Sequence, residues 1–257
     1  MEDLFKAPAF IINLDRKTER YESALEHIKA AGYRDIRRFS AIDGSDPEAI
    51  AAAWRELGYA TTPEYDAADP EFEKYPGRIG VYLSQNLIWK KMVDEKIPIA
   101  TIFEDDVVFH DDWKILAPVY YDRTPADAEV IMMGAQFMGS IPRQHIVSLP
   151  TYCLHAYIVK NAGATKLLKV MRMFKPRTID CILFDLQAVC LTQGRRCPFT
   201  YYDWCGALFP CKTARASNPA WNIRNHGLVF QDEKFESDIK PYDVDLERDV
   251  WARALVM

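Results

Sequence analysis

The stretch Ile97-Pro98-Ile99-Ala100-Thr101-Ile102-Phe103-Glu104-Asp105-Asp106-Val107-Val108 decides the fold of this chain. Its first seven residues are mainly apolar and predict a short buried strand. Three adjacent acids then interrupt the apolar pattern at the expected carboxyl end of that strand. Ligands of open α/β sheets bind at this edge. The stretch therefore predicts an α/β fold with a polar site at the end of a central strand.

The residues before this stretch predict a strand–helix–strand opening, which is how nucleotide-binding α/β domains commonly begin. The apolar periodicity and turn residues predict a strand over 9–14, an amphipathic helix over 17–31, and a strand over 36–39 that ends in a turn at 41–44. These elements are followed by a predicted helix over 47–57, an irregular loop over 59–77 and a helix over 80–95.

The second half predicts further elements of the same α/β type. The expected order is a strand over 129–133, a loop through Pro150, a strand over 152–159, helices over 162–173 and 179–192, and a strand over 200–202. We find no internal repeat or linker and predict a single domain over 1–257. We expect residues 1–110 to form its nucleotide-binding half and residues 111–257 to form a second half, which ends in a C-terminal segment that wraps the domain.

Composition restricts the class of protein. The 257 residues are enough for one sizeable α/β domain with its own core. A composition of 49% hydrophobic and 27% charged residues is that of a globular protein and excludes a disordered or fibrous one. The net charge of -5 argues against a nucleic-acid partner, because such proteins usually carry a basic surface.

Targeting signals and cysteines point to the compartment. The start Met1-Glu2-Asp3 lacks a basic region followed by an apolar stretch, and no apolar run approaches the ~20 residues of a transmembrane segment. We therefore expect a soluble, cytoplasmic protein. None of the six cysteines has CxxC spacing, which disfavours a zinc cluster. We expect reduced thiols in place of disulfides.

The acid triplet has two interpretations. Three neighbouring carboxylates repel each other, and a divalent cation removes that cost. Magnesium and manganese prefer oxygen ligands and keep waters that phosphate oxygens can replace. Alternatively, the triplet is a solvated turn or a helix N-terminus, where acids are stabilised. No GxxxxGK[ST] segment is present, which excludes a P-loop nucleotidase.

Six segments, taken in order, resemble glycosyltransferase family 25, which includes lipopolysaccharide glycosyltransferases and collagen galactosyltransferases. They are INLDR at 12–16 with Arg20, FSAIDG at 39–44, GVYLSQ at 80–85 followed by IW at 88–89, FEDDV at 103–107, AYIV at 156–159 with GA at 163–164 and LL at 167–168, and SDI at 237–239. The chain departs from the family pattern at Val81 and Gln85, where the family often has Cys and His. Glutamine donates and accepts hydrogen bonds but does not titrate.

The resemblance implies a GT-A type, Rossmann-like domain with a mixed central sheet flanked by helices. It also implies transfer of a hexose, galactose or glucose, from a UDP-sugar to a hydroxyl of a glycan, lipid-linked or protein acceptor, as in lipopolysaccharide biosynthesis. The transfer is expected to be inverting and assisted by Mn²⁺ or Mg²⁺. The metal would act as a Lewis acid and template. Its expected ligands are Asp106, Glu104 and a late histidine, His226.

The donor contacts follow from the same motifs. The expected donor-binding residues are Asn13, Asp15, Arg16, Arg20, Ala41, Asp43, Gly44, Ser84, Gln85 and Asp105. Ser84 and Gln85 are expected early on a helix, where free N–H groups favour anions. The alternatives are ordinary first-turn residues for this pair and a solvated helix face for Arg16 and Arg20.

An inverting transfer needs a base, and Asp180 is the candidate, with Asp185 as the fallback. Alternatively, Asp180 is a helix cap. His155 is a weaker metal-ligand candidate than His226. Trp89, Trp204 and Trp221 either stack on sugars or pack in the core.

Two other functions stay open: a catalytically silent nucleotide-sugar-binding relative, and a metal-dependent nucleotidyltransferase that releases pyrophosphate.

Overall fold

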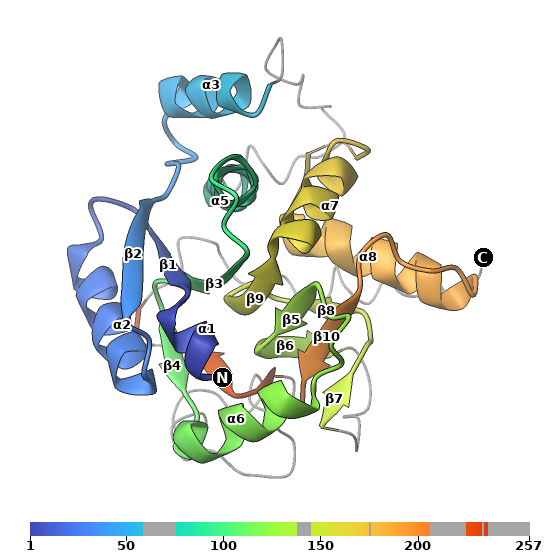
Figure 1. The fold of residues 1–257 in the computed structure, drawn as a ribbon. Helices are drawn as coiled ribbons and strands as arrows, with labels where there is room; N and C mark the ends of the chain where they lie inside the picture. Colours follow the sequence, from blue (N-terminus) through green and yellow to red (C-terminus); the bar gives the residue numbers. More distant parts are fainter. Residues whose placement is uncertain (59–75, 138–144, 175, 206–224, 233, 236–257) are drawn as a thin grey trace.

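The structure is a computed structural model that describes residues 1–58, 76–137, 145–174, 176–205, 225–232 and 234–235. Its centre is a seven-stranded mixed sheet (Figure 1). In order across the sheet, the strands are β2 (Asp35–Ser40), β1 (Pro8–Asn13), β3 (Ile99–Glu104), β9 (Ala156–Lys160), β5 (Val130–Met132), β10 (Tyr201–Trp204) and β7 (Ile146–Val147). Strands β9 and β7 run against the other five.

Helices cover both faces of this sheet. One face carries α1 (Glu2–Lys6), α2 (Thr18–Ala31) and α6 (Trp113–Arg123), and the other carries α3 (Pro47–Glu56), α5 (Gly77–Asp94), α7 (Asn161–Met171) and α8 (Ile179–Thr192). Successive strand residues point to opposite faces. Along β1, Phe10 and Ile12 accordingly pack in the core beneath α5, whereas Ala9 and Ile11 pack in the core beneath α2.

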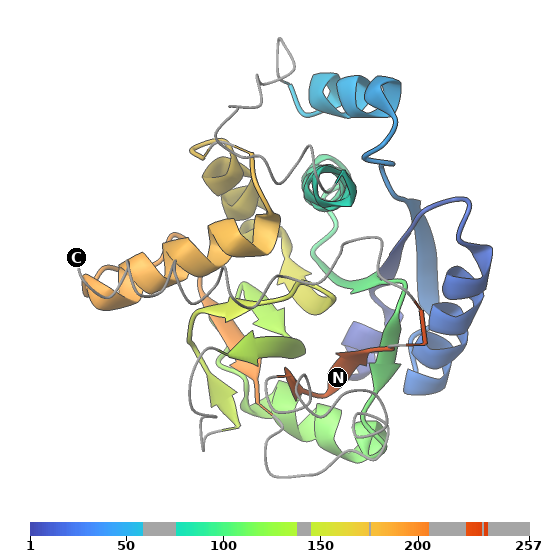
Figure 2. The same ribbon diagram turned by 180° about the vertical axis from the view of Figure 1, so that it is seen from behind.

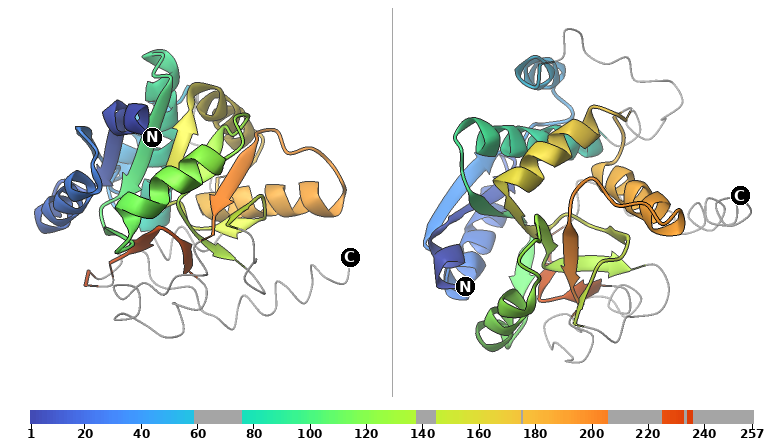
Figure 3. Two further views of the ribbon diagram at one scale, coloured as in Figure 1. Left: turned by 60° about the horizontal axis from the view of Figure 1, so that its bottom comes forward. Right: turned by 45° about the vertical axis from the view of Figure 1, so that its right-hand side comes forward.

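Two small sheets bring the late chain back to the middle of the molecule. Strand β6 (Gly134–Phe137) lies between β11 (Asn225–Gly227) and β8 (Thr151–Tyr152). Strand β12 (Val229–Gln231) pairs with β4 (Val107–Phe109), and its register sets Gln231 opposite Val107. In Figure 2 and Figure 3 the red late strands run beside the green strand β4. Gln231 is thereby placed next to the acid triplet.

The predicted α/β fold with a mixed sheet and flanking helices is confirmed. The boundaries of the helices and strands differ from the predicted ones where an element depends on backbone conformation or on distant residues. The loop expected before Pro150 contains β6 and β7, whose partners lie far along the chain. The single strand expected over 152–159 is two strands, because Cys153 adopts a φ of 76° between β8 and β9. Helix α6 was not predicted and contains Pro118, a residue that disfavours helix interiors.

Some predictions fall partly outside the described residues. The loop expected over 59–77 lies there except for Pro76 and Gly77, and so does most of the C-terminal segment. The five described cysteines are free thiols, as expected, and Cys211 lies outside the described part. Within the described residues, every helix is too short or too polar to cross a membrane.

Candidate functional site

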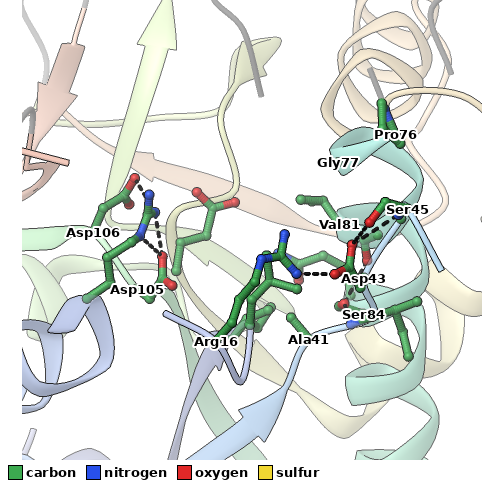
Figure 4. Close-up of a pocket in the computed structure, with 18 of the residues that line it drawn as sticks. Arg16, Ala41, Asp43, Ser45, Pro76, Gly77, Val81, Ser84, Asp105 and Asp106 are labelled. Carbon is green, nitrogen blue, oxygen red and sulfur yellow. Dashed lines mark hydrogen bonds and ion pairs between the residues drawn. The ribbon is translucent and has the colours of Figure 1, made fainter. Parts of the chain in front are cut away.

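A cavity of about 310 Å³ lies at the carboxyl ends of the parallel strands β1, β2 and β3 (Figure 4). Parallel pairing brings these ends together, since Ile12 of β1 is opposite Glu104 and Asn13 is opposite Ser40. Ten of the fifteen predicted site residues line the cavity: Arg16, Arg20, Ala41, Asp43, Gly44, Ser84, Gln85, Glu104, Asp105 and Asp106. The cavity therefore gathers segments that are far apart in the sequence.

The acid triplet forms one end of this cavity. Strand β3 ends at Glu104, and Asp105 and Asp106 make the turn into β4. Arg20 reaches this turn from α2: its Nε donates to Asp105 Oδ1 at 2.8 Å and its guanidinium donates to Asp106 Oδ2 at 3.1 Å. Asn13 Nδ2 donates to Asp105 Oδ2 at 2.7 Å. Asp105 is thus held by a cation and an amide, both from the strand–helix opening.

Burial and mutual repulsion make these acids hard to ionise. Burial raises the pKa of Glu104 to about 8, and the charges of Asp106 and Asp105 add to the rise. Burial raises the pKa of Asp106 to about 6, while the Arg20 guanidinium opposes the rise. Burial lowers the pKa of Arg20, but the charges of Asp106 and Asp105 outweigh it and the net shift is upward. A further bound cation would favour the ionised carboxylates.

One carboxylate oxygen of the triplet has no hydrogen-bond partner and could bind such a cation. Asp106 Oδ1 is buried and accepts no hydrogen bond within the described residues. No group of three or more His, Cys, Asp and Glu residues in the described part is arranged to hold a metal. An octahedral ion bound by one or two carboxylates, with waters and phosphates completing the shell, needs no such group. His226 lies on β11, but its side chain is outside the description.

Asn13 and Asp15 do not line the cavity. Asn13 is 1% exposed and supports Asp105 from behind, while its Oδ1 accepts from Arg38 Nε at 3.0 Å. Asp15 pairs with Arg38 at 3.2 Å and accepts from Ser40 at 2.6 Å on the outer side of the sheet edge. These contacts give Asn13 a positioning role in place of the predicted direct donor contact, and they hold Asp15 away from the cavity.

The other end of the cavity is the segment after β2. Arg16 pairs with Asp43, which also accepts from Ser45 Oγ at 2.6 Å. Figure 4 shows these side chains opposite Asp105 and Asp106, with Ser84 beside them. Because α2 begins at Thr18, Arg16 precedes the helix, and its alternative interpretation as part of a solvated helix face with Arg20 is wrong. Arg20 itself is only 11% exposed.

Two glycines let this segment lie against helix α5. A Cβ on Gly44 would lie 1.7 Å from the carbonyl oxygen of Pro76, and a Cβ on Gly80 would lie 2.3 Å from that of Ile42. No side chain fits within such distances. Gly44 was predicted to permit a close approach of its backbone to another group. The group that lies against it is the backbone at the start of α5.

The anion-binding rationale for Ser84 and Gln85 is wrong. Helix α5 begins at Gly77, so both residues lie in its third turn, where backbone N–H groups bond within the helix. Ser84 Oγ instead donates to Gly80 at 2.6 Å and accepts from the Ile42 N–H at 2.9 Å, which fastens the segment after β2 to the helix. Gln85 is fully buried and lines the cavity.

The two predicted bases differ in position. Asp180 is the second residue of α8 and accepts from the N–H groups of Cys181 at 2.9 Å and Cys153 at 3.4 Å. Burial raises its pKa, and its charge contributes to the raised pKa of Glu104, which places it near the acid turn. It lines a small neighbouring cavity in place of the main one. Asp185 is exposed, pairs with Arg177 and lies outside both cavities.

The remaining aromatic and histidine candidates are structural. His155 is buried, its Nε2 contacts the Val229 carbonyl at 3.0 Å, and burial lowers its pKa to about 4. Trp89 and Trp204 are fully buried core residues. Trp221 lies outside the described residues, as do residues 237–239.

Gln231 lines the cavity but was not predicted from the sequence. It lies on β12, with its Nε2 3.4 Å from Glu104 Oε2. The two residues are 127 positions apart, and only the pairing of β12 with β4 brings them together. No local pattern around Gln231 indicates this contact.

Comparisons with known proteins agree on one family. The model of "Glycosyltransferase family 25 (LPS biosynthesis protein)" matches residues 6–152. A "Glycosyltransferase 25 family member" of Anopheles gambiae is 28% identical over an alignment of 201 residues, and the match covers 68% of this chain and 31% of that protein.

Two other relatives carry more specific names. "Procollagen galactosyltransferase 1-A" of Xenopus laevis is 28% identical over an alignment of 188 residues, and the match covers 66% of this chain and 29% of that protein. "Probable inactive glycosyltransferase 25 family member 3" of Bos taurus is 26% identical over an alignment of 194 residues, and the match covers 68% of this chain and 31% of that protein. The matches thus cover less than a third of these curated relatives.

Proposed function

The chain belongs to glycosyltransferase family 25, and on this premise we propose that it transfers a hexose from a UDP-sugar to an acceptor hydroxyl. The observation that carries the proposal is the cavity that joins a cation, an acid triplet and the segment after β2 at the edge of parallel strands. Its volume of about 310 Å³ is at the lower end of ligand sites. Galactose is favoured over glucose by the name of the Xenopus laevis relative.

The charge distribution suggests how the donor lies. A diphosphate is the most anionic part of a nucleotide sugar, and Arg20 is the most buried cation in the cavity lining. The segment from Ala41 to Ser45 offers backbone groups and the Asp43 carboxylate, which suit the hydroxyls and N–H groups of a nucleoside. We therefore place the diphosphate near Arg20 and the uridine near residues 41–45.

A divalent cation fits this arrangement. Asp106 would hold it through the oxygen that has no hydrogen-bond partner, with Glu104 as the second carboxylate. When bound, Mn²⁺ or Mg²⁺ supplies positive charge that stabilises the departing nucleoside diphosphate. Arg20 would share this role, since it already neutralises part of the triplet.

Asp180 is the proposed base for an inverting transfer. It would take the proton from the acceptor hydroxyl as the oxygen bonds to the anomeric carbon and the bond from that carbon to the diphosphate breaks. Its raised pKa makes its carboxylate a better proton acceptor than an ordinary aspartate. The backbone N–H groups of Cys153 and Cys181 hold it in one orientation.

A second candidate function is nucleotide-sugar binding without turnover. It is favoured by the Bos taurus relative, whose name describes it as probably inactive. The two functions share the donor site and differ in whether UDP is released.

The test measures UDP release from UDP-galactose and UDP-glucose, with and without Mn²⁺, using lipopolysaccharide or a procollagen peptide as acceptor. Donor binding is measured in parallel. Asp106→Asn removes a proposed metal ligand, and Asp122→Asn changes an exposed acid on α6. We expect Mn²⁺-dependent release in the wild type and in Asp122→Asn, with a large loss in Asp106→Asn. Binding without release supports the second candidate, and full activity of Asp106→Asn refutes the metal assignment.

A further inference from the structure

Gln85 lines the cavity, and its carboxamide has a hydrogen-bond donor without a partner in the described residues. Gln85 is 0% exposed, and its Nε2 is buried with no hydrogen-bond partner in the described residues. Its Oε1 accepts a hydrogen bond from the Tyr157 hydroxyl. Buried polar groups are nearly always hydrogen-bonded, and each exception calls for an explanation. Since Gln85 lines the cavity, a ligand acceptor is the explanation that the geometry offers.

Two neighbouring aromatic residues determine which end of the amide meets the cavity. Trp89 Nε1 is a donor only and bonds to the Tyr157 hydroxyl oxygen at 2.8 Å. The Tyr157 proton must therefore be donated elsewhere, because an unpaired buried hydroxyl proton is costly. The atom of Gln85 that faces Tyr157 must then be the oxygen, so the NH₂ group is the part left for the cavity.

The surroundings of this NH₂ group limit the type of acceptor. Tyr157 on β9 pairs with Ile102, two residues before Glu104 on β3. Glu104 lines the same cavity as Gln85. The diphosphate is placed near Arg20 and the uridine near residues 41–45, so the hexose is the part of the donor left for this NH₂ group. A hydroxyl can accept from the amide and direct its own proton toward Glu104, which keeps acceptor oxygens in either protonation state.

Resting on the proposed function, we propose that Gln85 determines donor specificity by donating a hydrogen bond to one hydroxyl of the hexose. Tyr157 and Trp89 are positioning residues that keep the amide in the donating orientation. The bond involves the sugar and not the nucleotide. Its loss therefore weakens the binding of UDP-hexose and leaves the binding of UDP unchanged.

Calorimetric titrations of UDP and of UDP-galactose and UDP-glucose test this inference. The isosteric variant Gln85→Glu keeps an acceptor for Tyr157 and replaces the donor, and Gln85→Leu removes both groups. Gln187→Leu is the matched control, because Gln187 is also a buried helical glutamine but does not line the main cavity. We expect both Gln85 variants to raise the Kd of the preferred UDP-hexose about tenfold, equivalent to about 1.4 kcal/mol. The Kd of UDP should stay within about twofold.

A series of monodeoxy UDP-hexoses identifies the hydroxyl. One analogue should bind the wild type about tenfold more weakly than its parent and should bind Gln85→Leu no more weakly than the parent does. This comparison uses the wild type as well, so a variant that folds poorly does not remove the test. If every deoxy effect adds to the Gln85→Leu effect, the inference is wrong.

The positioning role is tested with Tyr157→Phe. This variant should weaken UDP-hexose binding in the wild-type background and have no further effect in Gln85→Leu. Tyr201→Phe, a buried tyrosine of β10 away from the cavity, is its control. Failure of wild-type protein to bind UDP overturns the proposed function and this inference together. UDP binding with unchanged hexose affinity in both Gln85 variants overturns only the inference.

Discussion

The buried ion pairs of Arg20 with two carboxylates offer a test whose magnitude follows from the structure. Arg20→Ala removes the guanidinium between Asp105 and Asp106, where the side chains are each 11% exposed. Arg37 binds both oxygens of a single carboxylate, that of Asp35, at 2.8 and 2.6 Å, and these side chains are 43% and 37% exposed. Arg37→Ala is therefore a control for the loss of an exposed arginine–carboxylate pair.

The expected losses differ severalfold. Breaking a buried pair by removing one partner costs roughly 3–5 kcal/mol, since a charge is left uncompensated. We expect about 3 kcal/mol for Arg20→Ala at pH 7, because its acids retain some solvent contact. An exposed pair contributes about 0–1 kcal/mol. For a chain of this size, each kcal/mol lowers Tm by about 2–4 °C. The losses are thus about 6–12 °C for Arg20→Ala and at most about 4 °C for Arg37→Ala.

The assay is urea unfolding followed by tryptophan fluorescence, with thermal melts in parallel. The Arg20→Ala loss should shrink as pH falls through about 6, because protonated Asp106 no longer needs a counter-charge. Equal losses in the two variants, or an Arg20→Ala loss that grows on acidification, would refute the claim that the buried triplet depends on this cation.

Three further outcomes are expected. Asp180→Asn should keep the wild-type Kd for UDP-hexose and reduce transfer at least about a hundredfold, as for a lost general base; a weakened Kd contradicts a pure base role. For Asp203, which is fully buried with a pKa raised to about 7 by burial, the folded state binds its proton more tightly than the unfolded state does. Stability should therefore fall as pH rises from about 4 to about 7, by at most about 4 kcal/mol, and Asp203→Asn should flatten this part of the urea-unfolding profile. Gly44→Ala should destabilise the protein by about 1–3 kcal/mol and weaken UDP binding, because its Cβ would overlap the Pro76 carbonyl oxygen; unchanged values in both assays contradict that packing.

Much of the fold could be predicted because its strongest signals are local. The apolar run before Glu104 is β3, and the strand–helix–strand opening is β1, α2 and β2. The periodicity of residues 179–192 corresponds to α8. Each of these segments buries either one face or its whole length, so its hydrophobic pattern indicates whether it is a helix or a strand. The elements that were not predicted depend on contacts with other strands or on backbone conformation. Strand β6 is a strand because β11 and β8 pair with it. Cys153 follows β8 with a positive φ that the neighbouring sequence does not indicate.

The candidate site shows the same limit. Arg20, Asp43 and the acid triplet could be placed together because parallel strands end at one edge. The start of α5 could not be placed, and an error of three residues moved Ser84 and Gln85 out of the first turn and changed their roles. Gln231 was missed because its place depends on β12 pairing with β4. Roles that follow from side-chain orientation, such as the support of Asp105 by Asn13, need the structure.

The central claim is that the cavity at the ends of β1, β2 and β3 holds a nucleotide-sugar donor. A crystal structure of the protein with UDP and Mn²⁺ tests it most directly. We predict the diphosphate beside Arg20 and Asp106, with the uridine against residues 41–45. UDP bound on another surface, or an empty cavity at a UDP concentration that saturates the protein, would contradict the claim.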